Sequence, residues 1–396
     1  MSMLRHCLLI VCVVALSVRA MAQVWAPYSA LPDLYPSMAL AMTYFVNDPT
    51  EDHSHDLGDL NGLLGISVQV PRRNARVQLT LTCTGGPALF DSATIDVTVP
   101  RAREDYIITP TIPFNQARLA SIRQVQTVFI TYAVTIDGKA QPPRTETLRV
   151  QSVNVCPFGV RDDAGQYTSY AFLFAAYVNE DHPQLDRILQ EALQKNYVDA
   201  FVGYQSGPAD VYRQVLAIWR VLQDRGLRYS NSTTTVADPD QVASQHVRLV
   251  DESLSHTQAN CTDGSVLLAS VLRKVGIEPI LVTIPGHMFV GFDLDDESSE
   301  QAYLETTLLN APAGSIAAAP TDLTQLLLSY VPSLTAADQT AVDQFVVAIQ
   351  TGNRLFADNR IAIESGTGDY SATPIAEARL AGIMPIPFVD RRPSTK

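Results

Sequence analysis

Three side chains in the second half of the chain have the types that thiol acyl transfer requires, and the first of them is Cys261. The apolar residues after it recur at helical spacing: Val266, Leu267, Val271, Leu272 and Val275. This spacing predicts a helix that begins at Cys261 and stops at Gly276, with Asn260 as a suitable cap. A cysteine at a helix N-terminus feels the positive end of the helix dipole, which favours the thiolate over the thiol.

Three apolar runs after this helix predict strands that carry the other two side chains. The runs are Pro279–Ile284, His287–Leu294 and, after an acidic turn, Ala302–Leu309. With the turn centred near Asp296, positions 287 and 305 face each other across an antiparallel pair and project from the same face.

Cys261, His287 and Glu305 then form a nucleophile, a base and a carboxylate that orients the base. His246 and His256 are alternative bases, but they lack a strand context and a carboxylate placed opposite.

The order Cys, His, acid, with the cysteine opening a helix, resembles the transglutaminase-like superfamily over roughly residues 200–310. The matching segments are Asn260–Ser265, Pro285–Val290 and Leu304–Thr307. The third member is usually Asp in that family, and here it is Glu305. The resemblance implies a papain-like thiol enzyme that acts on a protein or peptide through an acyl-thioester. It also implies that no metal or organic cofactor is needed, and for an exported bacterial-type protein it favours hydrolysis over crosslinking.

Acyl transfer also needs donors where negative charge develops on the substrate oxygen. Gln245 and Gln258 precede the nucleophile and are the candidates for this role beside the Cys261 backbone N–H. The alternative interpretation of either glutamine is an ordinary surface residue. Metal chemistry is the weaker possibility: residues 52–56 (DHSHD) read better as a solvated loop, and Cys261 with His287 supplies few ligands for zinc.

The N-terminal segment and the charge restrict where the protein works. Residues 1–22 have the pattern of a secretory signal, with Arg5, an apolar core from Leu8 to Val18 and a small-residue cleavage site. We therefore expect a secreted or periplasmic protein without a membrane span. The net charge of −13 argues against nucleic acid and anionic membrane surfaces as partners.

Three cysteines, Cys83, Cys156 and Cys261, follow the predicted signal. Cys83 and Cys156 could bridge in an oxidising compartment, which would leave Cys261 alone. The alternative is three free, buried thiols.

The rest of the chain predicts an α+β protein. After an extension at 23–64, alternating apolar and polar residues at 65–156 are typical of an immunoglobulin-like β-sandwich. A transglutaminase-like core at 157–310 follows, with helices that begin at Pro183 and Pro208, and its helix-start Cys packs on an antiparallel sheet. A helical extension at 311–385, with helices near 321–330 and 336–350, precedes a disordered tail at 386–396.

The sequence thus favours an exported thiol acyl-transfer enzyme, a cysteine peptidase or amidase, with a Cys–His–Glu triad. The alternative is a catalytically silent binding or scaffold protein of the same fold, since fold does not imply function. Substrate and oligomeric state are left open.

Overall fold

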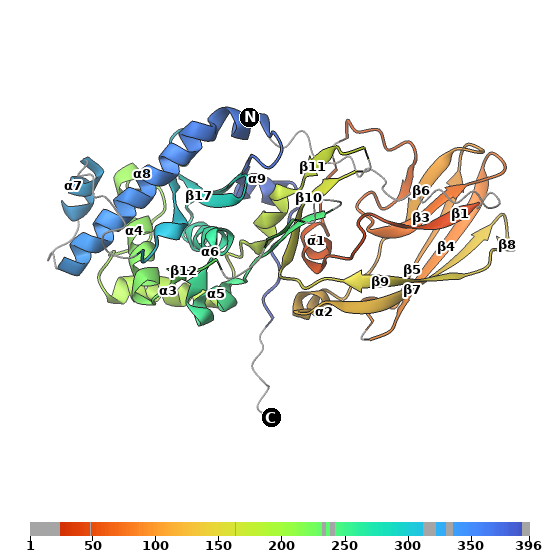
Figure 1. Cartoon of the computed structure of the whole chain (residues 1–396), viewed down its shortest axis with the longest axis horizontal. Helices are drawn as coiled ribbons and strands as arrows, with labels where there is room; N and C mark the ends of the chain where they lie inside the picture. The colour runs from red at the N-terminus through yellow and green to blue at the C-terminus, as the bar shows by residue number, and fades with distance from the viewer. Residues whose placement is uncertain are drawn as a thin grey trace, which may run out of the picture.

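The computed structural model describes residues 24–389 except 48, 87, 163, 232–234, 238–241, 312–321 and 330–335. Within these residues the protein is mixed α+β with several antiparallel sheets (Figure 1). Sheets of the N-terminal half occupy the right of the view, and the helices of the C-terminal half surround a smaller sheet on the left. The predicted signal segment lies outside the described residues.

The N-terminal half contains two sheets. The first has the order β1 (Trp25–Ser29), β3 (Leu64–Gln69), β6 (Asp105–Thr109), β2 (Asp56–Gly58). The second has the order β5 (Ser92–Val99), β4 (Ala75–Thr84), β7 (Gln126–Ile136), β8 (Lys139–Ala140), and β9 (Arg144–Val150) also pairs with β7. Two short helices, α1 (Pro36–Ala41) and α2 (Gln116–Ser121), belong to this half. Because β1 and β2 pair with β3 and β6, the residues expected to form a separate extension are part of the first sheet.

The alternation of apolar residues in this half decides which face of each strand is buried. Every second residue of β4 from Ala75 to Cys83 is buried, and so is every second residue of β7 from Val128 to Ile136. Asp137 and Gly138 form the two-residue turn after β7, and both have positive φ as such a turn requires.

A third sheet joins the two halves. Its order is β11 (Tyr167–Ser169), β10 (Val155–Arg161), β14 (Val242–His246), β13 (Thr235–Ala237). β10 follows the N-terminal sheets directly and pairs with β14, which lies shortly before the nucleophile in the chain. Figure 1 shows β10, β11 and α1 in the centre, between the two halves.

The C-terminal half is built on one antiparallel sheet. Its order is β18 (Gln301–Leu304), β17 (His287–Asp293), β16 (Pro279–Ile284), β19 (Ser371–Pro374). The helices of this half are η1 (Ala171–Tyr177), α3 (Pro183–Gln194), α4 (Pro208–Asp224), α5 (Val250–His256), α6 (Cys261–Lys274), η2 (Thr306–Leu308), α7 (Asp322–Ser329), α8 (Ala336–Ser365) and α9 (Ile375–Leu380). A short parallel pair, β12 (Arg228–Tyr229) and β15 (Gln258–Ala259), lies beside the start of α6.

Several boundaries differ from the sequence prediction. α8 continues to Ser365, whereas the sequence predicted an end near residue 350. The strand expected from Ala302 to Leu309 ends at Leu304, where the chain turns into η2. The expected disordered tail is wrong for its first residues, because Ile386 is only 3% exposed and its N–H donates to the Ala176 carbonyl oxygen.

The disulfide interpretation is also wrong. Cys83 lies in β4 and Cys156 in β10, and both are free and buried, so the alternative of free thiols holds for them. No described helix is both long enough and apolar enough to cross a membrane.

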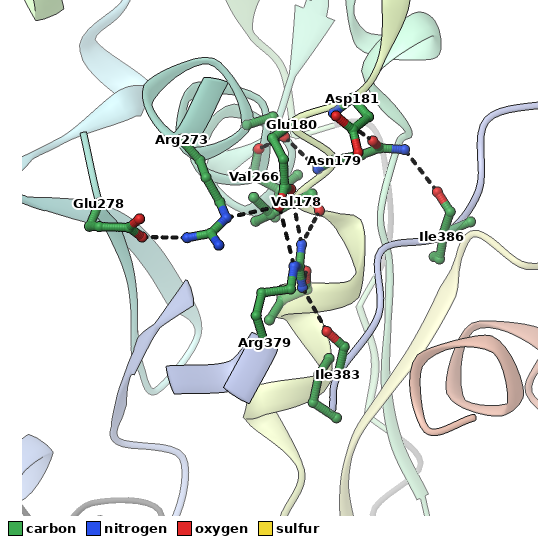
Figure 2. A network of polar contacts seen from close by, with 12 residues as sticks. Val178, Asn179, Glu180, Asp181, Val266, Arg273, Glu278, Arg379, Ile383 and Ile386 are labelled. Carbon is green, nitrogen blue, oxygen red and sulfur yellow. Dashed lines mark hydrogen bonds and ion pairs between the residues drawn. The ribbon is translucent and has the colours of Figure 1, made fainter. Parts of the chain in front are cut away.

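An ion-pair network holds the C-terminal segment onto α6 (Figure 2). Arg273, near the end of α6, bridges Glu180 and Glu278, and Arg379 of α9 donates to Glu180 and to the Val178 carbonyl oxygen. Burial raises the pKa of the Glu180 carboxyl, but the hydrogen bonds from the two guanidinium groups outweigh it and hold that pKa below its usual range. The network fixes α9, which directly follows β19, an edge strand of the sheet that carries His287.

Candidate functional site

The N-terminus of α6 is fixed by a capping box and a buried ion pair. The Asn260 side chain accepts from the Asp263 backbone N–H at 2.8 Å, and Asp263 accepts from the Asn260 backbone N–H at 3.0 Å. The Asp263 side chain is fully buried and pairs with Arg248 at 2.7 Å. Cys261 is therefore the first residue of a helix whose entry geometry is set by side chains on both sides of it, as the sequence predicted.

His287 opens β17, and its Nε2 atom lies 2.6 Å from the Glu305 Oε2 atom. The two residues are not directly opposite, which corrects the predicted register. Leu304 pairs with Val290, so Glu305, one residue beyond the strand, comes opposite Phe289. The carboxylate reaches the imidazole diagonally on the same face of the sheet, a distance that the longer Glu side chain can span.

Glu305 is held by contacts from three directions. Its Oε1 atom accepts from the Thr307 backbone N–H at 2.9 Å and from the Thr307 hydroxyl at 2.6 Å. Its own backbone N–H donates to the Ala348 carbonyl oxygen of α8 at 3.0 Å. At only 3% exposure, this carboxylate is buried with each oxygen satisfied.

α8 is the element that supports this strand end. The Asn353 side chain accepts from the Tyr303 backbone N–H at 2.8 Å. A Cβ atom on Gly352 would come within 2.5 Å of the Tyr303 backbone, so a glycine is needed for the helix to approach β18 this closely. The sequence does not predict this role for the C-terminal helices, because nothing in their local pattern indicates which strand they cover.

The thiol of Cys261 and the imidazole of His287 lie close enough for each to shift the pKa of the other. Burial raises the pKa of the Cys261 thiol, but the hydrogen bond and charge of His287, the Met288 amide and the Thr262 hydroxyl bring the pKa below its ordinary value. Burial lowers the pKa of the His287 imidazole, and the bonds to Cys261 and Glu305 more than reverse this, so the pKa is about 10. Both shifts favour a thiolate–imidazolium pair over the neutral thiol and imidazole.

The hydrogen bonds of Glu305 and the charge of His287 keep the carboxylate charged despite its burial. Burial raises the pKa of its carboxyl, while the hydrogen bonds and charge of His287 and the donors of Thr307 lower the pKa below its ordinary value. A negative carboxylate beside Nε2 leaves the Nδ1 atom for the thiol, which is the orientation that a general base needs.

The two glutamines predicted as oxyanion donors, Gln245 and Gln258, lie on different strands. Gln245 is buried in β14, opposite Cys156 of β10, and its side-chain amide donates to the His246 carbonyl oxygen at 3.0 Å. It is therefore held in the third sheet. Gln258 is exposed on β15, three residues before Cys261 in the chain. Neither glutamine belongs to the groups that set the thiol pKa.

The alternative bases are placed elsewhere. His246 lies at the end of β14, and His256 is an exposed residue at the end of α5 whose ring nitrogen contacts the Glu252 carbonyl oxygen at 2.8 Å. Within the described residues, no group of three His, Cys, Asp or Glu side chains is arranged to hold a metal ion. His55, from the loop considered as a metal site, instead stacks on Tyr106.

Tyr229 is a site residue that sequence analysis missed. It lies on β12, paired with Ala259 two residues before the nucleophile, and it is 45% exposed. Burial raises the pKa of its phenol, and the negative charges of Cys261 and Glu305 raise the pKa further, so the hydroxyl keeps its proton. The only sequence signal is an aromatic residue shortly after the helix stop at Gly226.

No protein-family model matches the chain, and no curated protein matches it.

Proposed function

We propose that the protein is a thiol acyl-transfer enzyme with Cys261 as nucleophile, His287 as base and Glu305 as the carboxylate that orients the base. The observation that carries the proposal is the His287–Glu305 hydrogen bond next to a thiol whose pKa His287 lowers, with that thiol at the N-terminus of a capped helix. A structural cysteine would be buried away from charge, whereas this thiol has its pKa lowered by a partly exposed imidazole.

The reaction proceeds in two stages. The Cys261 thiolate attacks the carbonyl carbon of an amide, and the C–N bond breaks as the His287 imidazolium gives its proton to the leaving amine. Water then attacks the thioester while His287 takes one of its protons, and the acid product leaves as the thiolate is restored. Glu305 stabilises the imidazolium in each proton transfer and keeps Nδ1 directed at sulfur.

The oxyanion of each tetrahedral intermediate needs donors beside the thiol. The backbone N–H of Cys261 is in the first turn of α6, where amides have no intrahelical acceptor. The Tyr229 hydroxyl is a second donor candidate, because Tyr229 pairs with Ala259 two residues before the nucleophile and the charge of Cys261 raises the pKa of its phenol. We prefer it to Gln245, whose amide is engaged inside its own sheet.

We assign the C-terminal half to the transglutaminase-like, papain-like class on the same evidence: helix-start Cys, strand His and acid beyond the next strand of one antiparallel sheet. The paired sheets before it are proposed to form an immunoglobulin-like spacer or docking module. The secretory pattern of residues 1–22 supports an exported compartment for the enzyme, and we propose a protein or peptide as its substrate.

The test is the pH dependence of cysteine alkylation. Mature protein is treated with iodoacetamide across a range of pH, and the labelled cysteine is located by mass spectrometry beside His287→Ala. We expect Cys261 to react with an apparent pKa well below about 8.5, the free-cysteine value, and to lose this reactivity in the variant. Cys83 and Cys156 are internal controls, because both are buried. A Cys261 that titrates like a free thiol, independently of His287, would favour the silent scaffold instead.

A further inference from the structure

A small apolar slot lies beside the proposed nucleophile, bounded by α4, α6 and η2. Its volume is about 10 Å³, close to the space of one water molecule. Its walls include Trp219 of α4, Leu268 of α6 and Leu309. Apolar side chains thus make up most of the walls.

One wall of the slot is formed by residues that are close to Cys261 in the chain or in contact with it. Ala259 and Gly264, both lining residues, flank Cys261 in the chain. Thr306, also a lining residue, directs its hydroxyl to the Cys261 carbonyl oxygen at 3.4 Å. The exposed side chain of Tyr229 lies at the outer side of the same slot. A group attached next to a carbonyl carbon that the thiol attacks would therefore have this slot within reach.

The walls limit what can enter. A Cβ atom on Gly264 would come within 3.0 Å of the Thr306 hydroxyl oxygen, so the wall beside Cys261 is already tight. Trp219 is 1% exposed, and its indole nitrogen has no hydrogen-bond partner among the described residues. A methyl or hydroxymethyl group adds little volume to this space, whereas a branched or aromatic side chain would overfill it.

We propose that this slot receives the side chain of the acyl-donor residue and restricts it to the size of alanine or serine. The substrate class is therefore a peptide with a small residue on the acyl side of the scissile bond. This assignment rests on the proposed acyl transfer at Cys261, and its test is chosen so that the two can fail separately.

The experiment measures covalent labelling of Cys261 by N-acetyl-aminoacyl chloromethyl ketones that differ only in the side chain: alanine, serine, leucine and phenylalanine. The thiolate displaces chloride, a C–S bond forms as the C–Cl bond breaks, and no turnover is required. Rates are divided by the iodoacetamide rate of the same protein, because iodoacetamide has no side chain and reports thiol activation alone. We expect the alanine and serine reagents to label at least about tenfold faster than leucine and phenylalanine.

Two leucines one turn apart on α6 provide a matched pair of variants. Leu268 is 2% exposed and lines the slot, and Leu272 is 0% exposed and does not. Leu268→Ala is expected to raise the relative rate of the leucine reagent about tenfold, while Leu272→Ala, with a similar loss of buried volume, leaves the order of rates unchanged. If either variant fails to fold, Leu268→Val and Leu272→Val make the same comparison with a smaller cavity.

The outcomes separate the two proposals. A normal iodoacetamide activation profile with equal rates for all four ketones would overturn the slot assignment and leave the enzyme intact. A change in side-chain preference in Leu272→Ala equal to that in Leu268→Ala would also overturn it. An unactivated Cys261 in the iodoacetamide arm would refute the proposed function itself, and the slot assignment with it.

Discussion

Replacing Glu305 with glutamine is expected to disable the proposed base by reversing the tautomer of His287. The carboxylate uses both oxygens: Oε1 accepts from the Thr307 amide and hydroxyl, and Oε2 is 2.6 Å from His287 Nε2. A glutamine amide has a single oxygen. Because the Thr307 backbone N–H can only donate, that oxygen is expected to remain there, and the NH₂ group then faces Nε2.

An NH₂ group opposite Nε2 requires an imidazole whose proton is on Nδ1, the nitrogen that must accept the proton of Cys261. The variant also lacks the negative charge that helps to hold the His287 pKa at about 10. The corresponding Asp-to-Asn change in a serine-protease triad lowers kcat about 10⁴-fold through the wrong tautomer. We expect a loss of roughly 10³- to 10⁴-fold for Glu305→Gln, by the same mechanism.

Glu305→Asp is the matched control, because it keeps the charge and both oxygens. It withdraws the carboxylate by about 1.5 Å, one C–C bond, which stretches the bond to His287 beyond hydrogen-bond range. The assay compares pH profiles of Cys261 alkylation and, once a substrate is found, kcat, with thermal melting to monitor folding. We expect Asp to fall between wild type and Gln. If the folded Gln variant alkylates and turns over like wild type at every pH, the orienting role of Glu305 is refuted.

Three further predictions follow from the same geometry. The rate of acyl transfer should rise with pH through the lowered pKa of Cys261, because the thiolate forms there. It should fall through about pH 10, where His287 loses the proton that it gives to the leaving amine. A pH–rate profile that keeps rising above pH 10 contradicts the ion pair. Arg248→Met should destabilise the fold by roughly 3–5 kcal/mol, because it removes the ion-pair partner of the buried Asp263 carboxylate. Urea unfolding measures this change, and an unaltered urea midpoint argues against a stabilising Arg248–Asp263 pair. Gly352→Ala should cost about 1–3 kcal/mol, because the helix must retreat from the strand before Glu305. It should also lower kcat and iodoacetamide labelling at low pH, since a displaced Glu305 supports the charge of His287 less well. Full activity at normal stability would show that this close approach is unnecessary.

Local patterns were enough to determine the elements that carry the site. α6 begins at Cys261, β16 spans the predicted Pro279–Ile284, and β17 begins at His287, because capping residues, helical spacing and β-branched runs act over a few neighbouring residues. The same holds for the alternation in β4 and β7 and for the helices that begin at Pro183 and Pro208. The chemistry of Cys261, His287 and Glu305 could be proposed from sequence because it depends on residue types that these elements bring to one end of a sheet.

The fine placement of those residues was decided by tertiary packing. The turn before β18 is centred at position 297 rather than 296, which shifts the pairing by two residues and makes the Glu305 contact diagonal. Arg248 pairs with Asp263, α8 accepts a hydrogen bond from the Glu305 N–H, and Tyr229 comes near enough for the charge of Cys261 to raise the pKa of its phenol. Each of these contacts joins segments that are distant in the chain, where no local period constrains the partner. The sequence determined which groups could react, and the packing of distant segments decided how each one is held.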